Sequence, residues 1–543
     1  MKNNSKFETN YNALKLSNIN LANIIKNVSD KSDSCYSAPV IAKNNELVPL
    51  LKDGKALFSI YNPAKDADNF LKDINFDENQ FIAVSSLANA QHLTKALNFA
   101  NIHILIIEKN AESIADLFNY FDFVRFLNNK NFSLCTLNDL EETFKNSYIP
   151  QLHGKFLHLA LRPWAQYNAE TEEKIQIILK NCLEHISADY SVQAHFAKIW
   201  QRNILRNIKT LSQINQENFD FPTEKKAAII GAGPSLDESI DFLKINRKNY
   251  FIIATDTAWR ILLQYNISAD AVVTIDGQNI SYRHFMDKFP NKETCFVIDL
   301  CAHPTVAEKA LKNGNRIQFV ASNHPLCTFI RQYAAQKNFY FPPEIDTTSG
   351  TVTIAALDFA VKCGFTEIEL FGADFAYTKS KPYAKGSYLD STFENASTLL
   401  SSKETLFNAL MFRTPVIRKN NTTVTTAVLN RYAKSLDEYL AKCKTKINIH
   451  KYVNKNMTHI FANIHATENF IPIFLSKTLY KSFDYADFKV WLLNLLKSYD
   501  PAITAAILPL AAWCERMKLY KSSSGSILFV FEYAHKMASK QTM

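Results

Sequence analysis

The sequence is poor in the residues that build flexible linkers, disulfide frameworks and membrane spans. Its 543 residues include only 11 glycines and 17 prolines, which argues against long flexible linkers. The nine cysteines are odd in number and form no Cys-x-x-Cys pair, so we expect reduced thiols rather than disulfides or a zinc site. The longest apolar stretch, Ala502–Trp513, is too short to cross a bilayer and contains Pro509. Because the N-terminus also lacks the apolar core of a signal peptide, we expect a cytoplasmic protein with no membrane span.

Positive charge is present but not clustered. The formal net charge is +9, and the lysines are scattered along the chain, often near Glu or Asp. A nucleic-acid groove needs basic residues gathered on one face, so we expect no nucleic-acid partner. The excess charge fits either a surface that attracts anionic ligands or a simple abundance of lysine.

The pattern of apolar runs predicts an α/β protein of several domains. Strands alternate with helices in two regions, which is typical of parallel βαβ units in a doubly wound sheet. The predicted parts are a polar segment (1–45), an N-terminal α/β domain (46–170), a helical connector (171–222), a larger Rossmann-like α/β domain (223–445) and a mixed, mainly helical C-terminal region (446–543). Within the first segment, Tyr11–Ile25 fits a helix and the remainder is expected to be loosely ordered.

The N-terminal α/β domain offers little for a nucleotide. Its third strand, Ile102–Ile107, ends at Glu108, and an acidic residue in that position can bind ribose hydroxyls. The turn after its second strand, Ser85–Asn89, contains no glycine, so a phosphate would fit poorly there. The pattern favours a scaffold or a partner-binding domain.

The stretch Ala227–Leu236 begins the second α/β region and reads as strand, tight turn and helix start. Gly231 and Gly233 allow positive φ and close approach of a ligand to the backbone, Pro234 suits the first helical turn, and Ser235 can cap it. Free N–H groups at a helix N-terminus bind anions, so this turn is either a phosphate site or a plain strand-to-helix turn. Leu236 stands where a dinucleotide fingerprint needs its third glycine, and no Gly-Lys-Ser/Thr follows as a P-loop requires.

Polar residues follow several other strands of this region, where ligands of doubly wound sheets bind. Thr348, Ser349 and Gly350 precede an apolar helix expected over Gly350–Lys362, and they can cap it or hold phosphate. Asp276 and Asp374 each follow a strand and can act as base, bind ribose or a metal, or simply cap a turn. The loop Tyr377–Phe393, with Tyr383 and Tyr388, is a candidate lid.

Histidine is missing where a base would be sought. From Pro325 through Ile449 there is none, so a base in the loop after Asp374 cannot be histidine. His284, His303 and His324 lie in loops between strands, and their spacing fits no zinc site. Ser-His-Asp catalysis has no G-x-S-x-G motif to support it.

Taken together, these motifs resemble the MptE-like domain of motility-associated factor (Maf) proteins, a family of flagellin glycosyltransferases. The segments that carry the resemblance are GAGPSL, ATDTAWRILL, VVTIDGQ and TTSGTVTIAALDFAVKCGFTEIELFGADF. Upstream, ALFSIYNPAKDADNFL, LIIEKN and HFAKIWQRNILRNI resemble the Maf N-terminal domain. The resemblance covers about residues 50–440.

The resemblance implies a central domain similar to bacterial sialyltransferases, which hold a CMP-sugar with a related turn. The resemblance implies that the nucleotide contacts Gly231, Gly233, Pro234 and Ser235, and that Asp256 and Asp276 line the cleft. It implies that the cytidine or the sugar carboxylate region is bound by Thr348, Ser349 and Gly350. Asp374 would lie beside that turn, with Tyr383 and Tyr388 near the phosphate. The implied reaction moves a nonulosonic acid, such as pseudaminic or legionaminic acid, from its CMP form to Ser or Thr of flagellin.

Two features of the resemblance leave the chemistry open. The sialyltransferases place a histidine base after their G-x-D-F segment, and its absence here turns the prediction to Asp276 or Asp374. The archaeal namesake of the domain is a pterin pyrophosphokinase that uses ATP and Mg²⁺. A pyrophosphokinase and a non-catalytic protein that binds or escorts flagellin are therefore the alternatives. No cofactor beyond the donor is firmly implied, although a divalent metal is compatible with either transfer reaction.

Overall fold

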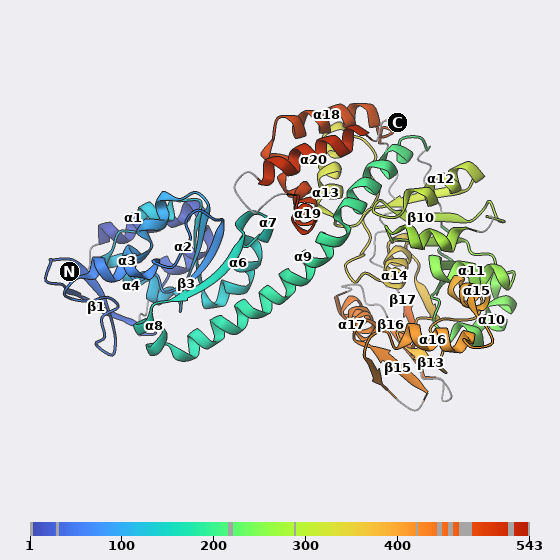
Figure 1. The fold of residues 1–543 in the computed structure, drawn as a ribbon, viewed down its shortest axis with the longest axis horizontal. Coiled ribbons are helices and arrows are strands. Elements are labelled where there is room, and N and C mark those ends of the chain that lie inside the picture. The colour runs from blue at the N-terminus through green and yellow to red at the C-terminus, as the bar shows by residue number, and fades with distance from the viewer. Residues whose placement is uncertain are drawn as a thin grey trace. The chain divides into compact units, whose positions relative to one another are not determined.

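The computed structural model describes residues 4–28, 32–214, 221–286, 289–419, 422–442, 448–453, 460–465, 480–519 and 526–540 (Figure 1). The chain forms two compact units. Unit 1 contains Met1–His195 and Leu508–Phe531, and unit 2 contains Phe196–Ile507 and Glu532–Met543. Within the described part of the chain, no helix combines the length and the apolar character needed to cross a bilayer. The eight cysteines among these residues are all buried free thiols, as the sequence predicts.

Unit 1 is built on a four-stranded parallel sheet, which confirms the predicted βαβ pattern. The strand order is β5 (Phe132–Thr136), β4 (Ile102–Glu108), β3 (Gln80–Ser85), β6 (Lys155–Ala160). Every residue of β3 is buried, because this central strand is covered on both faces. The other elements are α1 (Asn4–Ser17), α2 (Ile19–Lys26), β1 (Tyr36–Ile41), β2 (Leu47–Leu51), α3 (Pro63–Phe70), α4 (Ala111–Tyr120), α5 (Val124–Leu127), α6 (Leu140–Ser147), α7 (Pro150–His153) and α8 (Arg162–Tyr167).

The N-terminal segment is better ordered than its polar composition suggests. Helix α1 begins at Asn4, and the side chain of Asn10 is buried against the end of α4. Its amide nitrogen donates to the carbonyls of Phe118 and Phe121, at 3.2 and 2.8 Å, and its oxygen accepts from the Phe123 amide at 2.8 Å. The expectation of loose order outside one helix is wrong. Asn10 is a polar residue, yet its side chain is buried and its hydrogen bonds hold α1 against the end of α4.

The carboxyl end of the unit 1 sheet is filled by the chain itself. The buried Glu108 carboxylate accepts hydrogen bonds from the Tyr36 hydroxyl and the Leu87 amide, both at 2.7 Å. Burial raises the pKa of Glu108, and the hydrogen bonds from Tyr36 and Leu87 act in the opposite direction. The turn that lacks glycine still adopts positive φ, at Ser86 and Ala88. Because the Glu108 carboxylate is held by protein groups, the structure favours the scaffold interpretation of this domain over a ribose site.

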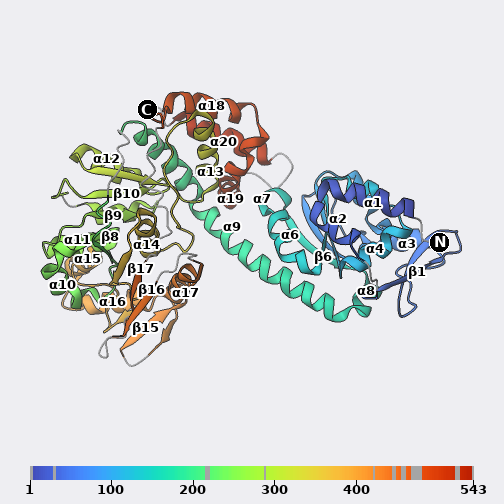
Figure 2. The ribbon, with the colours of Figure 1, turned by 180° about the vertical axis from the view of Figure 1, so that it is seen from behind.

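Helix α9 (Ala169–Leu211) is a single 43-residue helix that starts in unit 1 and ends in unit 2. Figures 1 and 2 show it as one uninterrupted helix. The helical stretch expected between Glu172 and Leu211 is thereby confirmed. An apolar stripe of Leu179, Cys182, Leu183 and Ile186 faces the core of unit 1.

Unit 2 is built on an eight-stranded sheet. The order is β11 (Arg316–Val320), β10 (Cys295–Asp299), β9 (Ala271–Thr274), β8 (Tyr250–Thr255), β7 (Lys226–Ile230), β12 (Glu367–Phe371), β17 (Ile460–His465), β16 (Asn448–Val453). The six strands from β11 to β12 are parallel, and β17 pairs antiparallel with both β12 and β16. The doubly wound α/β fold predicted from the sequence is confirmed, and the β16–β17 hairpin extends it.

The helices and short strands of unit 2 complete the fold. Helix α14 (Val352–Cys363) is mostly apolar and packs on β7, β8 and β9, where Ala355, Ala356 and Ala360 permit close approach to the sheet. The remaining elements are α10 (Leu236–Ile245), α11 (Asp256–Gln264), α12 (Pro304–Asn313), α13 (Pro325–Lys337), β13 (Tyr377–Thr378), α15 (Tyr388–Ala396), α16 (Lys403–Met411), β14 (Val416–Arg418), β15 (Thr423–Thr426), α17 (Ala427–Lys442) and α18 (Tyr485–Lys497), with α19 (Thr504–Arg516) and α20 (Ser526–Lys540) shared between the units.

Candidate functional site

The sheet of unit 2 reverses its winding between β7 and β12. Strands β8 to β11 continue on one side of β7, whereas β12 lies on the other side. In doubly wound sheets the ligand crevice lies beyond the carboxyl ends of the strands at such a reversal. The GAGPSL turn follows β7 and the Gly372–Asp374 segment follows β12, so the structure brings these two predicted motifs together.

The glycines of the turn are required because two backbones meet, not because of positive φ. The Gly231 amide donates to the Phe371 carbonyl at 2.7 Å, and the Gly233 amide donates to the Gly372 carbonyl at 2.8 Å. A Cβ on Gly231 would lie 2.5 Å from the Gly372 oxygen, and one on Gly233 would lie 2.5 Å from Asp374 Oδ2. The expectation of positive φ in this turn is wrong, since the left-handed residue at this junction is Gly372, with φ +62°.

Asp374 occupies the helix N-terminus where an anion was expected. The Ser235 amide donates to Asp374 Oδ2 at 2.8 Å, and the Ser235 hydroxyl donates to Oδ1. Ser235 therefore makes no side-chain cap of α10, and Pro234 precedes the helix rather than lying in its first turn. The anion held at this helix start is a carboxylate of the protein, which is what the positive end of a helix favours.

A second polar cluster lies at the carboxyl ends of β8 and β9. Asp256, buried at the start of α11, accepts from Thr274 Oγ1 at 2.9 Å and from the Thr257 amide at 2.7 Å. Asp276 follows β9 and accepts the Gln278 amide at 2.9 Å. His284 lies in the 3-10 helix Asn279–Phe285 that follows, and it is electrostatically coupled to both carboxylates.

Burial sets the charge states in this cluster. Desolvation raises the pKa of Asp256, and the neighbouring His284 opposes that shift. Desolvation lowers the pKa of His284, and Asp256 and Asp276 oppose that shift in turn. Tyr383 is partly exposed at its surface, and its pKa is raised to about 12 by desolvation and by nearby Tyr377 and Tyr388.

The structure adds His284 to the predicted site residues. Its ring meets the ring of Tyr388 edge-on, with centroids 4.5 Å apart. The sequence placed His284 in a loop after the strand that leads to Asp276, and that was the available signal. The sequence predicts no histidine base because the loop after Asp374, where the sialyltransferases place theirs, contains no histidine.

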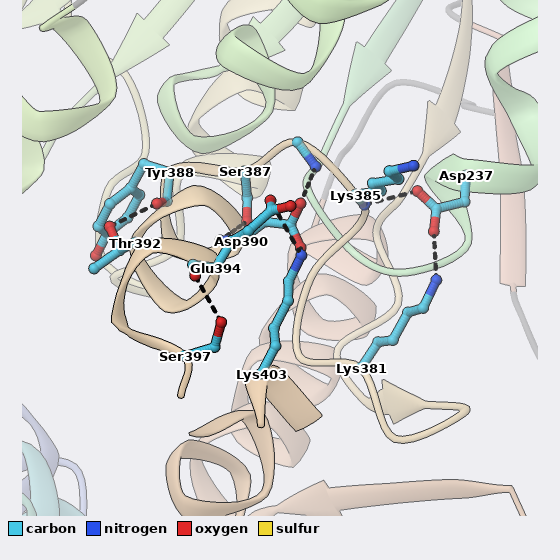
Figure 3. A network of polar contacts seen from close by, with 11 residues as sticks. Asp237, Lys381, Lys385, Ser387, Tyr388, Asp390, Thr392, Glu394, Ser397 and Lys403 are labelled. Atoms are coloured by element: carbon cyan, nitrogen blue, oxygen red, sulfur yellow. Dashed lines mark hydrogen bonds and ion pairs between the residues drawn. The ribbon is translucent and has the colours of Figure 1, made fainter. Parts of the chain in front are cut away.

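Hydrogen bonds and ion pairs connect the predicted lid, Tyr377–Phe393, to neighbouring helices (Figure 3). Lys381 pairs with Asp237 of α10 at 3.1 Å, and the Lys385 amide donates to the same carboxylate at 2.8 Å. Lys403 pairs with Asp390 of α15 at 2.6 Å. The Ala384 amide also donates to the carbonyl of Ala232 in the GAGPSL turn at 3.0 Å, so the lid lies against that turn.

The Thr348–Gly350 turn has local contacts. The Thr348 amide and hydroxyl both donate to Asp346 Oδ1, at 2.9 and 2.6 Å, and Ser349 Oγ accepts the Thr351 amide at 3.3 Å. Gly350 has φ +71°. Helix α14 starts at Val352, two residues later than expected, and its N-cap residue Thr351 makes no side-chain cap bond. The capping role expected of Thr348 and Ser349 is therefore wrong.

Two asparagines of α9 hold the loops beside the Asp276 cluster. Asn203 Nδ2 donates to the carbonyls of Gly277 and Cys301, both at 3.0 Å. Asn207 Nδ2, one turn further along the same helix face, donates to the carbonyls of Leu300 and Ala302, both at 2.9 Å. Sequence reasoning gave α9 only the role of a connector and missed this clamp.

The neighbouring Asp299 should make stability depend on pH. Burial raises its pKa from 3.8 to about 7, although the Cys301 amide donates to it. The folded state thus holds the proton more tightly than the unfolded state, so Asp299 favours folding at low pH and loses this contribution as the pH rises from about 4 to about 7. We expect the urea midpoint of Asp299→Asn to change less across that window than the wild-type midpoint. Equal changes in the two proteins would contradict this assignment.

Among the residues that the structure describes, no group of three or more His, Cys, Asp or Glu side chains is arranged to hold a metal ion.

Comparison with known proteins identifies the part of unit 2 that carries this site. Residues 202–380 match the family described as 6-hydroxymethylpterin diphosphokinase MptE-like. This part of the chain is therefore similar to an MptE-like domain. The match includes the GAGPSL turn, the Asp256, Asp276 and His284 cluster, Asp374, and both asparagines of α9.

The fold around the MptE-like domain is that of a solved Maf protein. The MAf glycosyltransferase from Magnetospirillum magneticum AMB-1 superimposes with a TM-score of 0.54 at 13% identity, covering 99% of this chain and 90% of that one. The predicted α/β fold, with an MptE-like domain in a Maf-type architecture, is thus confirmed.

Sequence relatives are found in Treponema pallidum (strain Nichols). Two uncharacterized proteins are 37% identical over 159 residues and 36% identical over 135 residues. These matches cover 28% and 25% of this chain, and the chain spans only 54% and 64% of the length of those relatives.

Proposed function

We propose that this protein is a glycosyltransferase that moves a nonulosonic acid from its CMP-activated form to Ser or Thr of flagellin. The observation that carries the proposal is the fold shared with a MAf glycosyltransferase along nearly the whole chain. A buried acid–base cluster beside the reversal point of the sheet supports it, because that edge is where doubly wound folds bind nucleotides.

The residues proposed for the donor lie on both sides of that reversal point. The nucleotide is proposed to contact Gly231, Gly233, Pro234 and Ser235, with Tyr383 and Tyr388 of the lid near its phosphate. The Thr348–Gly350 turn is proposed for the cytidine or the sugar carboxylate. Of the two carboxylates proposed to be catalytic, Asp374 already binds Ser235, whereas Asp276 lies beside the Asp256–His284 pair.

Transfer itself is the test of this proposal. The purified protein is incubated with a CMP-nonulosonate and unmodified flagellin, and intact-mass spectrometry of flagellin is combined with measurement of CMP release. We expect flagellin to gain the mass of the sugar residue and CMP to appear in equal amount. No mass gain with either pseudaminic or legionaminic donor would overturn the proposal.

Ligand binding gives an independent measurement. Because a ligand that binds only the folded state stabilises it, CMP at one hundred times its Kd should add about 2.7 kcal/mol of stability. We expect this as a rise in the Tm of unit 2 with CMP, and a smaller rise with ATP and Mg²⁺. Stabilisation by ATP and Mg²⁺ alone would favour the pyrophosphokinase.

The second candidate is a pyrophosphokinase, favoured by the description of the family that residues 202–380 match. It predicts that ATP and 6-hydroxymethylpterin yield AMP and a pterin diphosphate. Absence of AMP in the presence of Mg²⁺ would exclude it.

A further inference from the structure

His284 lies beside Asp256 and Asp276, and one of its ring nitrogens has no hydrogen-bond partner among the described residues. Its side chain is in a residue that is only 8% exposed, and Nδ1 has no hydrogen-bond partner among the described residues. A buried imidazole nitrogen without a partner is costly, because native structures pair nearly all such groups. Nδ1 is therefore free, among the described residues, to accept a hydrogen bond from a bound molecule.

Charged groups reach His284 from two neighbouring elements. Asp256 and Arg260 lie on α11, and Asp276 follows β9; the two carboxylates favour the protonated ring and Arg260 opposes it. Tyr388, at the start of α15, contributes the ring that lies against the imidazole. Burial outweighs the carboxylates and holds the ring neutral, which is the form able to accept a proton.

Two carboxylates of the site, Asp374 and Asp256, are less suited as proton acceptors. Asp374 Oδ1 and Oδ2 both bind Ser235. Asp256 has its two oxygens bonded to Thr274 and Thr257, and its burial keeps it away from solvent. An efficient base has a pKa near the working pH, and imidazole meets that condition more closely than an ordinary carboxylate.

We propose that His284 accepts the proton of the acceptor hydroxyl during transfer, while Asp256 and Asp276 stabilise the imidazolium that forms. The inference rests on the proposed function. The acceptor oxygen forms a bond to the anomeric carbon, the bond from that carbon to the phosphate oxygen breaks, and CMP leaves with the electron pair. The acceptor proton passes to His284 and then to water.

Tyr388 is the lid residue nearest to this proton acceptor. Its ring meets the imidazole edge-on, with centroids 4.5 Å apart. Tyr388 lies at the first position of α15, next to the N-cap residue Ser387 and the ion pair between Asp390 and Lys403 (Figure 3). The lid therefore helps to fix the position of the imidazole.

The test compares His284→Asn with His303→Asn in single-turnover transfer at saturating donor. His303 is a suitable control because it is buried to a similar degree in a nearby loop and its Nδ1 also lacks a partner among the described residues. We expect His284→Asn to lose about 10²–10⁴-fold in rate, with the KM for the donor unchanged and the acidic limb of the pH profile abolished. His303→Asn should stay within about threefold of wild type.

A second variant keeps the inference testable if His284→Asn does not fold. Asp256→Asn removes a carboxylate that stabilises the imidazolium, so the acidic limb of its pH profile should move to lower pH. A purely structural role of Asp256 would lower the rate without moving that limb.

The outcomes separate this inference from the proposed function. Wild-type protein that transfers no sugar fails the proposed function and this inference with it. Wild-type protein that transfers sugar, with a His284→Asn variant that keeps the wild-type rate and pH profile, overturns the role of His284 alone. If the acidic limb of the pH profile does not move in Asp256→Asn, Asp256 does not stabilise the imidazolium.

Discussion

The Gly372→Ala variant will lose about 2–5 kcal/mol of stability, because a left-handed backbone and a steric overlap act together. Gly372 has φ +62°, and a Cβ there would lie 2.3 Å from the Gly231 carbonyl oxygen. Gly231 directly follows β7, and its amide is bonded to the Phe371 carbonyl at the end of β12, so it cannot move away without disturbing the junction between these strands. We expect a large fall in the Tm of unit 2 and weakened binding of CMP.

Gly314→Ala is the matched control for this prediction. Gly314 ends α12 with φ +78°, yet nothing lies within 4 Å of its Cβ position. Only the conformational cost remains there, about 1–2 kcal/mol. Similar Tm values for the two variants would show that the close contact between Gly372 and Gly231 contributes nothing to the loss of stability.

The Asn203→Ala variant will lose about 2–4 kcal/mol, since two buried carbonyls lose their donor at once. Those carbonyls belong to Gly277, directly after Asp276, and to Cys301. A Cβ on Gly277 would lie 3.1 Å from Trp200 Cδ1 and 2.8 Å from the Cys301 oxygen, so this loop is packed tightly against α9. We expect a lower Tm together with slower transfer, because the Asp276 loop is released.

Asn246→Ala serves as the control for the asparagine clamp. Asn246 is only partly buried, and its side-chain amide donates to one carbonyl of α10, that of Phe242, at 3.0 Å. Its replacement should cost about 0.5 kcal/mol, as surface substitutions usually do. If Asn203→Ala unfolds at the same temperature as Asn246→Ala, the clamp does not stabilise the loops.

The sheets of both units could be read from the sequence because their strands are short apolar runs separated by polar turns. Tyr250–Thr255 and Ala271–Thr274 are buried at every position, as strands covered on both faces must be. The start of α14 was placed two residues early, since Thr348 and Ser349 suit a cap by composition and instead bind within their own turn. Helix boundaries depend on such local competition.

Only those features of the site that lie within a single short segment of the sequence could be predicted. The strand-end positions of Asp256, Asp276 and Asp374 follow from alternation of strand and helix. The close approach of Gly231 to Gly372 could not be predicted in this way, because a glycine in a sequence does not indicate which other segment of backbone will pack against it. The bonds from Asn203 span 74 and 98 residues, and no local pattern predicts a contact at that separation.

The long helix has a consequence for how such a protein is inherited. Domains are ordinarily exchanged by recombination in exposed linkers, where few contacts cross. Here the chain passes between its two units at residues 195–196, 507–508 and 531–532, and these points fall inside α9, α19 and α20. A crossover at any of them would join halves of two different helices. Exchange of one unit alone would therefore need three cuts inside helices, which is a heavier requirement than two cuts in exposed linkers.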